Sequence, residues 1–157
     1  MTRTDPIATG QVRIDATPAE VYRLVSDPTV MVTFAEEVRG ARWRGRASAA
    51  AVGARFSGSN RNGRRRWVTI CTVTEAVPGR RFAYEVETPF KVPISRWAYE
   101  IEPDGSGCRV TESSWLRLPR WFVPIAVLIT GEPDRAGRNN TNIAMTLSRL
   151  KAHLESR

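Results

Sequence analysis

The segment WVTICTVTEA, residues 67–76, is the clearest β-strand in the sequence, and the rest of the fold can be worked out from it in both directions. It is rich in β-branched residues, which suit the pleated surface of a sheet. Because successive side chains of a strand point to opposite faces, Trp67, Thr69, Cys71 and Val73 share one face. Both faces are apolar or small, so the pattern predicts a strand within a larger sheet.

An arginine-rich hairpin precedes this strand. Residues 54–60, ARFSGSN, alternate Phe56 with arginine and serine. The tip SNRNGRRRW, residues 59–67, holds four arginines, and Asn62 and Gly63 form the expected turn pair. The arginines either belong to a solvated turn or bind an anionic partner or the acidic end of a ligand. Nucleic-acid binding usually adds aromatic residues on an exposed face, whereas here they alternate into the sheet, so we expect no nucleic-acid partner.

Three more strands follow, joined by the turns VPGRR and PDGSG. They are FAYEVET at residues 82–88, ISRWAYEIE at residues 94–102 and CRVTESSWLRL at residues 108–118. Period-two alternation gives the first two strands one apolar face each, which carries Phe82, Tyr84, Val86, Trp97, Tyr99 and Ile101.

The N-terminal part combines one strand with two short helices. Residues 10–16, GQVRIDA, alternate as a strand, and Thr17 and Glu20 then form a capping box that starts a helix. A second short helix is expected around residues 29–37, and a further strand at residues 38–45. Apolar residues mark these elements: Val21, Leu24, Val25, Val30, Met31, Phe34, Val38 and Trp43.

A long helix closes the chain, from Asp134 to about Glu155. The sheet has one apolar face and this helix one apolar stripe, and each needs a partner. The economical arrangement is an α+β fold in which a curved antiparallel sheet of about seven strands wraps around the helix. At 157 residues the chain fits a single domain, residues 1–157. The stripe consists of Ala136, Asn140, Ile143, Leu147, Leu150 and Leu154, spaced by three and four residues.

Composition excludes several classes of protein. The formal net charge is +8, and all but Lys91 and Lys151 of the 24 basic residues are arginine, which fits a coding bias as well as a function. There is no C-x-x-C motif and no Cys/His cluster, so we expect no metal site and no cofactor. No apolar signal segment precedes residue 10, and the longest apolar run, residues 121–131, is too short to span a bilayer. We therefore expect a soluble cytoplasmic protein.

The order of these motifs resembles the START-like, or Bet v 1-like, superfamily with its helix-grip fold, and more narrowly its bacterial polyketide cyclase/dehydrase-like branch. The resemblance covers nearly the whole chain. It rests on IDATPAEVYRLVSDP, VGARFSGSNRNGRRRW, CTVTEAVPGRRFAYEV, RWAYEIEP, GCRVTESS and TLSRLKAHLE. It implies a cavity between the sheet and the last helix that accepts a small hydrophobic or amphipathic molecule. The superfamily includes cyclases, lipid carriers and hormone receptors, so the fold does not decide the activity.

The expected ligand-binding residues are those whose side chains should point into this cavity. They come from the inner face of the sheet, from the second helix and from the last helix: Phe34, Trp43, Phe56, Asn60, Trp67, Thr69, Cys71, Tyr84, Val86, Trp97, Tyr99, Ser114, Asn140, Ile143 and Leu147. Asn60 and Asn140 either fix a ligand carbonyl or hydroxyl or satisfy buried backbone groups.

Glu112 is the candidate catalytic residue. It shares a strand face with Val110 and Ser114, so it points inward unless a bulge turns it outward. A buried carboxylate must be paired, hydrogen-bonded or protonated. Glu112 is then either a polar anchor or general base in the cavity, or a structural partner for an arginine or for backbone groups.

The apolar run before the last helix, LPRWFVPIAVLITGEP, leaves four alternatives open. It is a lid over the cavity, a flap that touches a membrane transiently through residues 121–131, a dimer contact, or a packed segment beneath the sheet. The oligomeric state, monomer or homodimer, stays open with it.

Two functions fit the sequence. The first is a carrier or sensor that binds a lipid-like or polyketide-like molecule. The alternative is a cyclase or dehydratase that folds a carbonyl-rich substrate and moves protons with Glu112 or a tyrosine. The single histidine, His153, lies near the chain end, which argues against a histidine-based triad.

Overall fold

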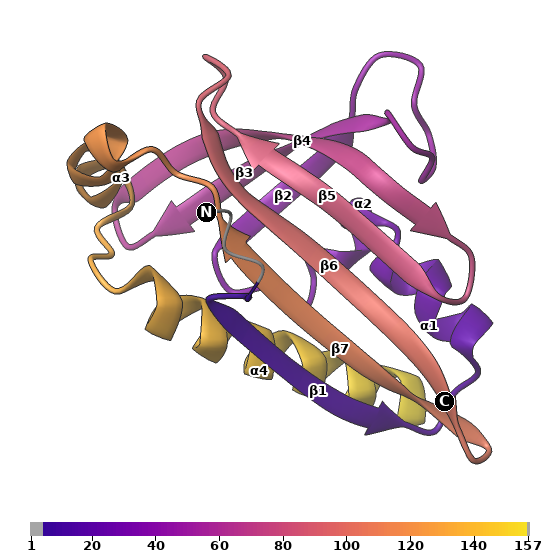
Figure 1. The fold of residues 1–157 in the computed structure, drawn as a ribbon. Helices are drawn as coiled ribbons and strands as arrows, with labels where there is room; N and C mark the ends of the chain where they lie inside the picture. The colour runs from indigo at the N-terminus through magenta and orange to yellow at the C-terminus, as the bar shows by residue number, and fades with distance from the viewer. Residues whose placement is uncertain (1–4, 157) are drawn as a thin grey trace.

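The computed structural model describes residues 5–156. It contains one seven-stranded antiparallel sheet with the strand order β1-β7-β6-β5-β4-β3-β2, so every strand after β2 pairs with the strand next to it in the chain and β1 closes onto β7. The strands are β1 Ala8–Ile14, β2 Val38–Trp43, β3 Arg55–Asn62, β4 Arg65–Val77, β5 Arg81–Glu87, β6 Pro93–Asp104 and β7 Gly107–Leu116. The predicted curved sheet is confirmed (Figure 1).

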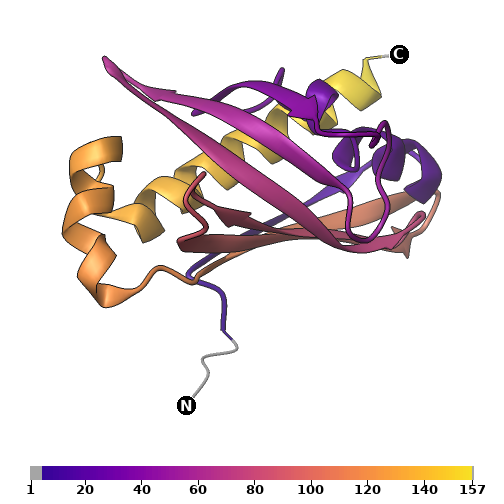
Figure 2. The ribbon, with the colours of Figure 1, turned by 90° about the horizontal axis from the view of Figure 1, so that it is seen from above.

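Within the described residues, five helical segments accompany the sheet. They are α1 Pro18–Val25, α2 Pro28–Met31, the 3₁₀ turn η1 Arg120–Phe122, α3 Val123–Thr130 and α4 Arg135–Glu155. Figures 1 and 2 show α1 and α2 at one end of the sheet and α3 at the other, with the sheet curled about α4. Both views agree with the helix-grip arrangement expected from the sequence.

The α4 helix crosses the edge strand β1 at close range. A Cβ atom on Gly10 would lie 2.8 Å from Cγ2 of Ile143, so only glycine permits this approach. The buried residues of α4 are Asn139, Ile143, Thr146, Leu147, Leu150 and Leu154. The stripe predicted from the sequence is correct from Ile143 onward.

At its N-terminal end the stripe was assigned to the wrong asparagine. Asn139 is buried, whereas Asn140 is exposed and accepts a hydrogen bond from the backbone N–H of Thr9 at 3.1 Å. Spacings of three and of four residues back from Ile143 both lie on one helix face. Here Asn139, four residues before Ile143, faces the protein interior. Asn140, three residues before Ile143, reaches out to the edge of β1.

The first helix begins as the capping box requires. The Thr17 hydroxyl accepts from the Glu20 N–H, and the Glu20 carboxylate accepts from the Thr17 N–H, at 3.1 and 3.0 Å. The second helix is shorter than predicted and covers one turn, Pro28–Met31, before the chain continues as turns to β2. These helices cover one end of the sheet, where Phe34 is buried and its ring lies 5.4 Å from that of His153.

The arginine-rich hairpin holds the apolar segment before α4. The Asn62 amide donates to the Thr130 carbonyl at 2.8 Å, and Nε of Arg65 donates to the Leu128 carbonyl at 3.0 Å. These carbonyls belong to the last turn of α3, where helical partners are missing. One part of the arginine run therefore has a structural role that the sequence did not reveal.

The turn of this hairpin differs by one residue from the predicted Asn62–Gly63 pair. Asn62 pairs with Arg65, so the two-residue loop is Gly63–Arg64. Gly63 has φ +62° and Arg64 does not have a positive φ, which is the pattern of a type II′ turn with glycine at its first central position.

Candidate functional site

A cavity of about 920 Å³ lies between the inner face of the sheet, the N-terminal half of α4 and the apolar segment that contains α3. Its volume falls in the range of about 300–1,000 Å³ that is usual for small-molecule sites. The predicted residues that line it are Phe56, Asn60, Trp67, Thr69, Cys71, Tyr84, Val86, Trp97, Tyr99, Glu112 and Ile143. Period-two alternation on the central strands thus identified most of the sheet wall.

Five predicted residues lie outside the lining. Phe34 and Leu147 are buried in the packed core, and Trp43 packs its ring 5.6 Å from that of Phe56. Ser114 is fully buried and accepts from the Asn139 amide at 3.2 Å. Asn140, as described above, faces the edge of β1. Helices α1 and α2 still contribute to the lining through Val25, Pro28 and Met31, and at the other end the cavity reaches α3.

Glu112 points inward, because β7 pairs regularly with both neighbours and no bulge interrupts its register. Its side chain is buried, and it is hydrogen-bonded to Tyr99, its partner across the strands. Its Oε1 atom has no hydrogen-bond partner among the described residues. Burial raises the pKa of Glu112 to about 8, although the hydrogen bond from Tyr99 opposes the shift.

Glu112 is therefore a neutral carboxylic acid at pH 7. In that form it has one O–H donor and a carbonyl acceptor. It can offer a proton or a hydrogen bond to a ligand carbonyl below about pH 8, and it can accept a proton only above that pH. This differs from the general-base role considered from the sequence.

The tyrosines and the cysteine beside Glu112 are also neutral. Burial raises the pKa of both Tyr84 and Tyr99 well above 10, and nearby ionisable groups, Glu112 among them, add to the effect. Burial raises the pKa of the Cys71 thiol to about 12. Since the thiolate is the nucleophilic form, Cys71 serves this wall as a small apolar residue.

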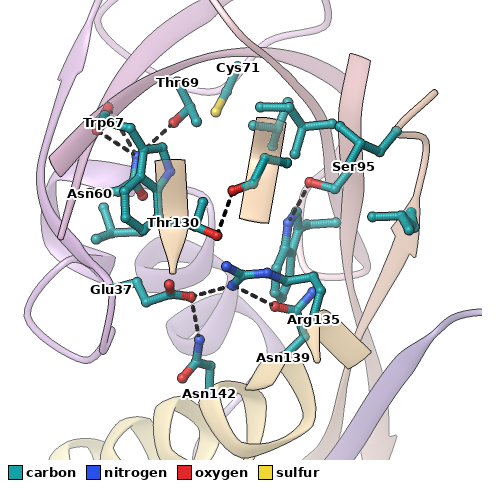
Figure 3. A pocket seen from close by; sticks show the side chains of 18 of the residues that line it. Glu37, Asn60, Trp67, Thr69, Cys71, Ser95, Thr130, Arg135, Asn139 and Asn142 are labelled. Atoms are coloured by element: carbon teal, nitrogen blue, oxygen red, sulfur yellow. Dashed lines mark hydrogen bonds and ion pairs between the residues drawn. The ribbon is translucent and has the colours of Figure 1, made fainter. Parts of the chain in front are cut away.

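A second polar cluster lies in the cavity, and sequence reasoning missed it. Glu37, just before β2, is buried, and its Oε1 accepts from Arg135 at 2.6 Å and from the Asn142 amide at 2.9 Å. Asn139 lies beside Arg135, with Oδ1 3.4 Å from Nη1. Figure 3 shows these side chains together at one side of the cavity.

One signal in the sequence could have located this cluster. Arg135, Asn139, Asn142 and Thr146 are spaced by four, three and four residues, so they form a polar continuation of the α4 stripe. Glu37 itself gave no signal, because it sits in an irregular segment 98 residues away from Arg135.

The rest of the wall is apolar with isolated polar groups. The Asn60 amide lies 3.2 Å from the Thr69 hydroxyl, and the Trp97 indole N–H donates to the Ser95 hydroxyl at 3.1 Å. Figure 3 shows Asn60 beside Thr69, and Ser95 on another part of the wall. Satisfied polar groups of this kind leave the aromatic surfaces of Trp67 and Trp97 free to contact a guest.

Exposed apolar side chains lie on the segments that border the cavity. Leu128 of α3 is 72% exposed, Trp121 of η1 is 66% exposed, and Phe90 in the β5–β6 loop is 89% exposed. None of the residues of α3 is buried. The segment is thus not packed beneath the sheet, and residues of α3 contribute to the cavity lining.

Two absences hold for the part of the chain that the structure describes. No group of three His, Cys, Asp or Glu side chains is arranged as metal ligands within residues 5–156. Among the same residues, no helix combines the length and the apolar character needed to cross a bilayer.

Comparison with known proteins gives a family and several structural relatives. A family model described as polyketide cyclase/dehydrase and lipid transport matches residues 6–155. No curated protein matches the sequence.

Three solved structures illustrate the similarity. The polyketide cyclase-like protein Cgl2372 of Corynebacterium glutamicum is 26% identical with a TM-score of 0.61, and the match covers 98% of this chain and 94% of that one. Protein CV1439 of Chromobacterium violaceum is 17% identical with a TM-score of 0.65, over 94% and 96% of the two chains. DynU16, a protein in the dynemicin biosynthetic locus, is 13% identical with a TM-score of 0.64; the match covers 94% of this chain and 46% of DynU16.

Proposed function

The chain belongs to the family of polyketide cyclase/dehydrase and lipid-transport proteins, and we propose that it is a carrier or sensor that binds one small hydrophobic or amphipathic molecule in its cavity. The observation that carries the proposal is a hollow of about 920 Å³ whose wall is mostly apolar. A cavity of this size and character is unfavourable to leave empty, because its lining lacks contacts on one side.

The charge states of the wall favour a carrier over an enzyme. Glu112 is neutral at pH 7, and burial keeps the Cys71 thiol protonated. The histidine at position 153 contacts Phe34 and does not line the cavity. Neither Glu112 nor Cys71 is thus a base or nucleophile at neutral pH, and the histidine does not reach the cavity.

The alternative is a cyclase or dehydratase, and one observation favours it. A neutral Glu112 hydrogen-bonded to Tyr99 is suited to donate a hydrogen bond to a carbonyl oxygen and so to assist enolisation or dehydration of a folded poly-carbonyl chain. In this reading the cavity contributes orientation and Glu112 contributes the proton.

Ligand binding is the experiment that tests the proposal. Trp67 and Trp97 line the cavity, so a guest should quench tryptophan fluorescence. We expect at least one member of a panel of aromatic polyketide-like molecules, fatty acids and sterols to do so, and to stabilise the protein by about 2.7 kcal/mol at one hundred times its Kd. A panel that gives neither quenching nor a rise in Tm contradicts the proposal.

Glu112→Gln separates the carrier from the enzyme. If Glu112 transfers a proton, the variant should lose on the order of a hundredfold in rate with a poly-β-keto substrate. If the protein is a carrier, the variant should change ligand affinity by only a few fold, because the amide keeps the shape of the side chain and its hydrogen bond with Tyr99.

We also propose that the segment 121–131 contacts an anionic membrane surface when the ligand is exchanged. Trp121 and several apolar side chains of α3 are exposed. The arginine-rich hairpin is hydrogen-bonded to the α3 backbone. An apolar helix next to basic residues is suited to lie at the boundary between anionic headgroups and acyl chains. A hydrophobic ligand could then pass between bilayer and cavity without crossing water.

A further inference from the structure

The Glu37 carboxylate has one satisfied oxygen and one free oxygen. Oε1 accepts from both Arg135 and Asn142, whereas Oε2 has no hydrogen-bond partner among the described residues. The side chain is only 9% exposed. Glu37 lines the cavity. Figure 3 shows Arg135 and Asn142 bonded to the same oxygen of its carboxylate.

The surroundings of Glu37 prepare it to accept a hydrogen bond. Its ion pair with Arg135 is 2.6 Å long, and a paired carboxylate is an acceptor with no donor of its own. Arg135 is held in turn beside Asn139, one turn further along α4. Leaving a buried acceptor without a partner is unfavourable, and Oε2 is itself a buried atom. A guest whose donor reaches this oxygen therefore gains affinity.

A second unpaired oxygen lies along the same wall. Oε1 of Glu112 also has no partner among the described residues, and Glu112 lines the same cavity. The two carboxyl groups are connected by a polar track, since Asn139 contacts both Arg135 and Ser114, and Ser114 stands two residues after Glu112 on the same face of β7. The Asn139 amide donates to the Ser114 hydroxyl at 3.2 Å.

We propose that Glu37 binds a hydroxyl group of the ligand, and that the ligand is therefore an apolar molecule with a hydroxyl at the Glu37 end and a second oxygen function directed toward Glu112. This inference rests on the proposed function, because it names the chemistry of the guest in that cavity. The two carboxyl groups then select for a molecule with oxygen at two separated positions, and they disfavour a plain hydrocarbon chain or ring system.

Matched pairs of probes test this directly. One pair is 16-hydroxyhexadecanoic acid and hexadecanoic acid, and the other is 2,6-dihydroxyanthraquinone and anthraquinone. Dissociation constants come from the quenching of tryptophan fluorescence. We expect the hydroxylated member of at least one pair to bind the unmodified protein about tenfold more tightly, which is the effect of one added buried hydrogen bond.

The Glu37→Gln variant tests which residue is responsible. It keeps the side-chain shape and one acceptor for Arg135 and Asn142, but it replaces the free acceptor with an amide donor. We expect the preference for the hydroxylated probe to fall to twofold or less, while the Kd of the unhydroxylated probe stays within about twofold. Glu75→Gln is the matched control, because Glu75 also pairs with arginines, Arg81 and Arg96, but does not line the cavity. It should leave the preference unchanged.

The outcomes distinguish this inference from the proposal on which it rests. Equal affinities within both pairs for the unmodified protein overturn the role of Glu37 and leave the ligand-binding proposal standing. A preference that survives Glu37→Gln also overturns it. If no member of either pair and no member of the wider panel binds, both proposals fail. Equal affinities in the unmodified protein overturn the inference even if the variant does not fold.

Discussion

Tyr99 and Glu112 lie directly opposite each other on β6 and β7, and their side chains are hydrogen-bonded inside the cavity wall. The pair combines two groups that are neutral at pH 7, since burial raises the pKa of Glu112 to about 8 and that of Tyr99 well above 10. The cavity is therefore polar at this position without carrying a charge, which suits an uncharged or amphipathic guest.

The raised pKa of Glu112 predicts that stability falls as the pH rises. The unfolded chain loses the proton of Glu112 near pH 4.5, whereas the folded protein keeps it until about pH 8. Between these values the folded state binds one more proton, so the stabilisation is complete below pH 4.5 and is lost as the pH approaches 8. The slope due to this residue is at most about 1.4 kcal/mol per pH unit.

Glu112→Gln isolates this contribution, because glutamine resembles the neutral carboxyl group and does not ionise. Urea unfolding at pH 5 and pH 8 should give similar stabilities for the two proteins at pH 5 and a clear advantage of the variant at pH 8. The same difference at both pH values would show that Glu112 is not held neutral by the fold.

Removing the cation beside Glu37 should destabilise the protein. Arg135→Gln leaves the Glu37 carboxylate buried without its ionic partner, and we expect a loss of about 2–4 kcal/mol in the free energy of unfolding at pH 7. Glu37→Gln in the same chain removes the isolated charge, so the double variant should recover part of this loss. Strictly additive effects in this double-mutant cycle would mean that the two residues do not interact.

The bonds from the hairpin should control the mobility of α3. Replacing both Asn62 and Arg65 with alanine removes the donors to the Thr130 and Leu128 carbonyls. We expect amide exchange within residues 123–131 to become roughly fivefold faster or more, which corresponds to the loss of about 1 kcal/mol. Arg64→Ala, at the tip of the same hairpin, is the control and should leave exchange in α3 unchanged. Unchanged amide exchange in the double variant would show that the hairpin does not hold α3 in place.

Vesicle flotation tests the proposed membrane contact. The protein should float with vesicles of phosphatidylcholine and phosphatidylglycerol and remain in solution with phosphatidylcholine alone. Leu128→Ser should abolish flotation, because Leu128 is among the most exposed apolar residues of the described chain. Val52→Ser is the matched control, because Val52 is 71% exposed. The backbone N–H of its neighbour Gly53 donates to the Val73 carbonyl, which lies in the half of β4 remote from the arginine-rich hairpin.

Two results would count against the membrane contact. Flotation that persists in Leu128→Ser would place the contact elsewhere. The other result is a protein that binds neither kind of vesicle and forms a dimer that Leu128→Ser dissociates. That result would assign α3 to a contact between two copies of this chain.

The sheet could be predicted from the sequence because period-two alternation holds over most of β4 to β7. Phe82, Tyr84, Tyr99 and Glu112 all point inward as alternation requires. The inward position of Glu112 depended on the absence of a bulge in β7, and that strand is regular. A bulge does occur in β4, between Val73 and Glu75, where alternation alone gives no warning of it.

The helix α3 and the Glu37 cluster could not be predicted, for two different physical reasons. The α3 helix is apolar on all sides and contains Pro124 in its first turn, so it has no amphipathic period from which to recognise a helix. Glu37 meets Arg135 and Asn142 only because the curled sheet brings the start of β2 against α4. Contacts of that kind follow from the tertiary fold, and the local pattern around Glu37 does not contain them.

Isotope-filtered nuclear Overhauser measurements on the protein with the tightest-binding member of the ligand panel show whether a small organic molecule occupies the hollow between the sheet and α4. We expect contacts from the bound molecule to the Trp97 ring, the Tyr99 ring and the Ile143 methyl groups, all of which line the cavity. Contacts confined to outer residues such as Leu128 and Trp121, or a protein that binds no member of the panel, would contradict this expectation.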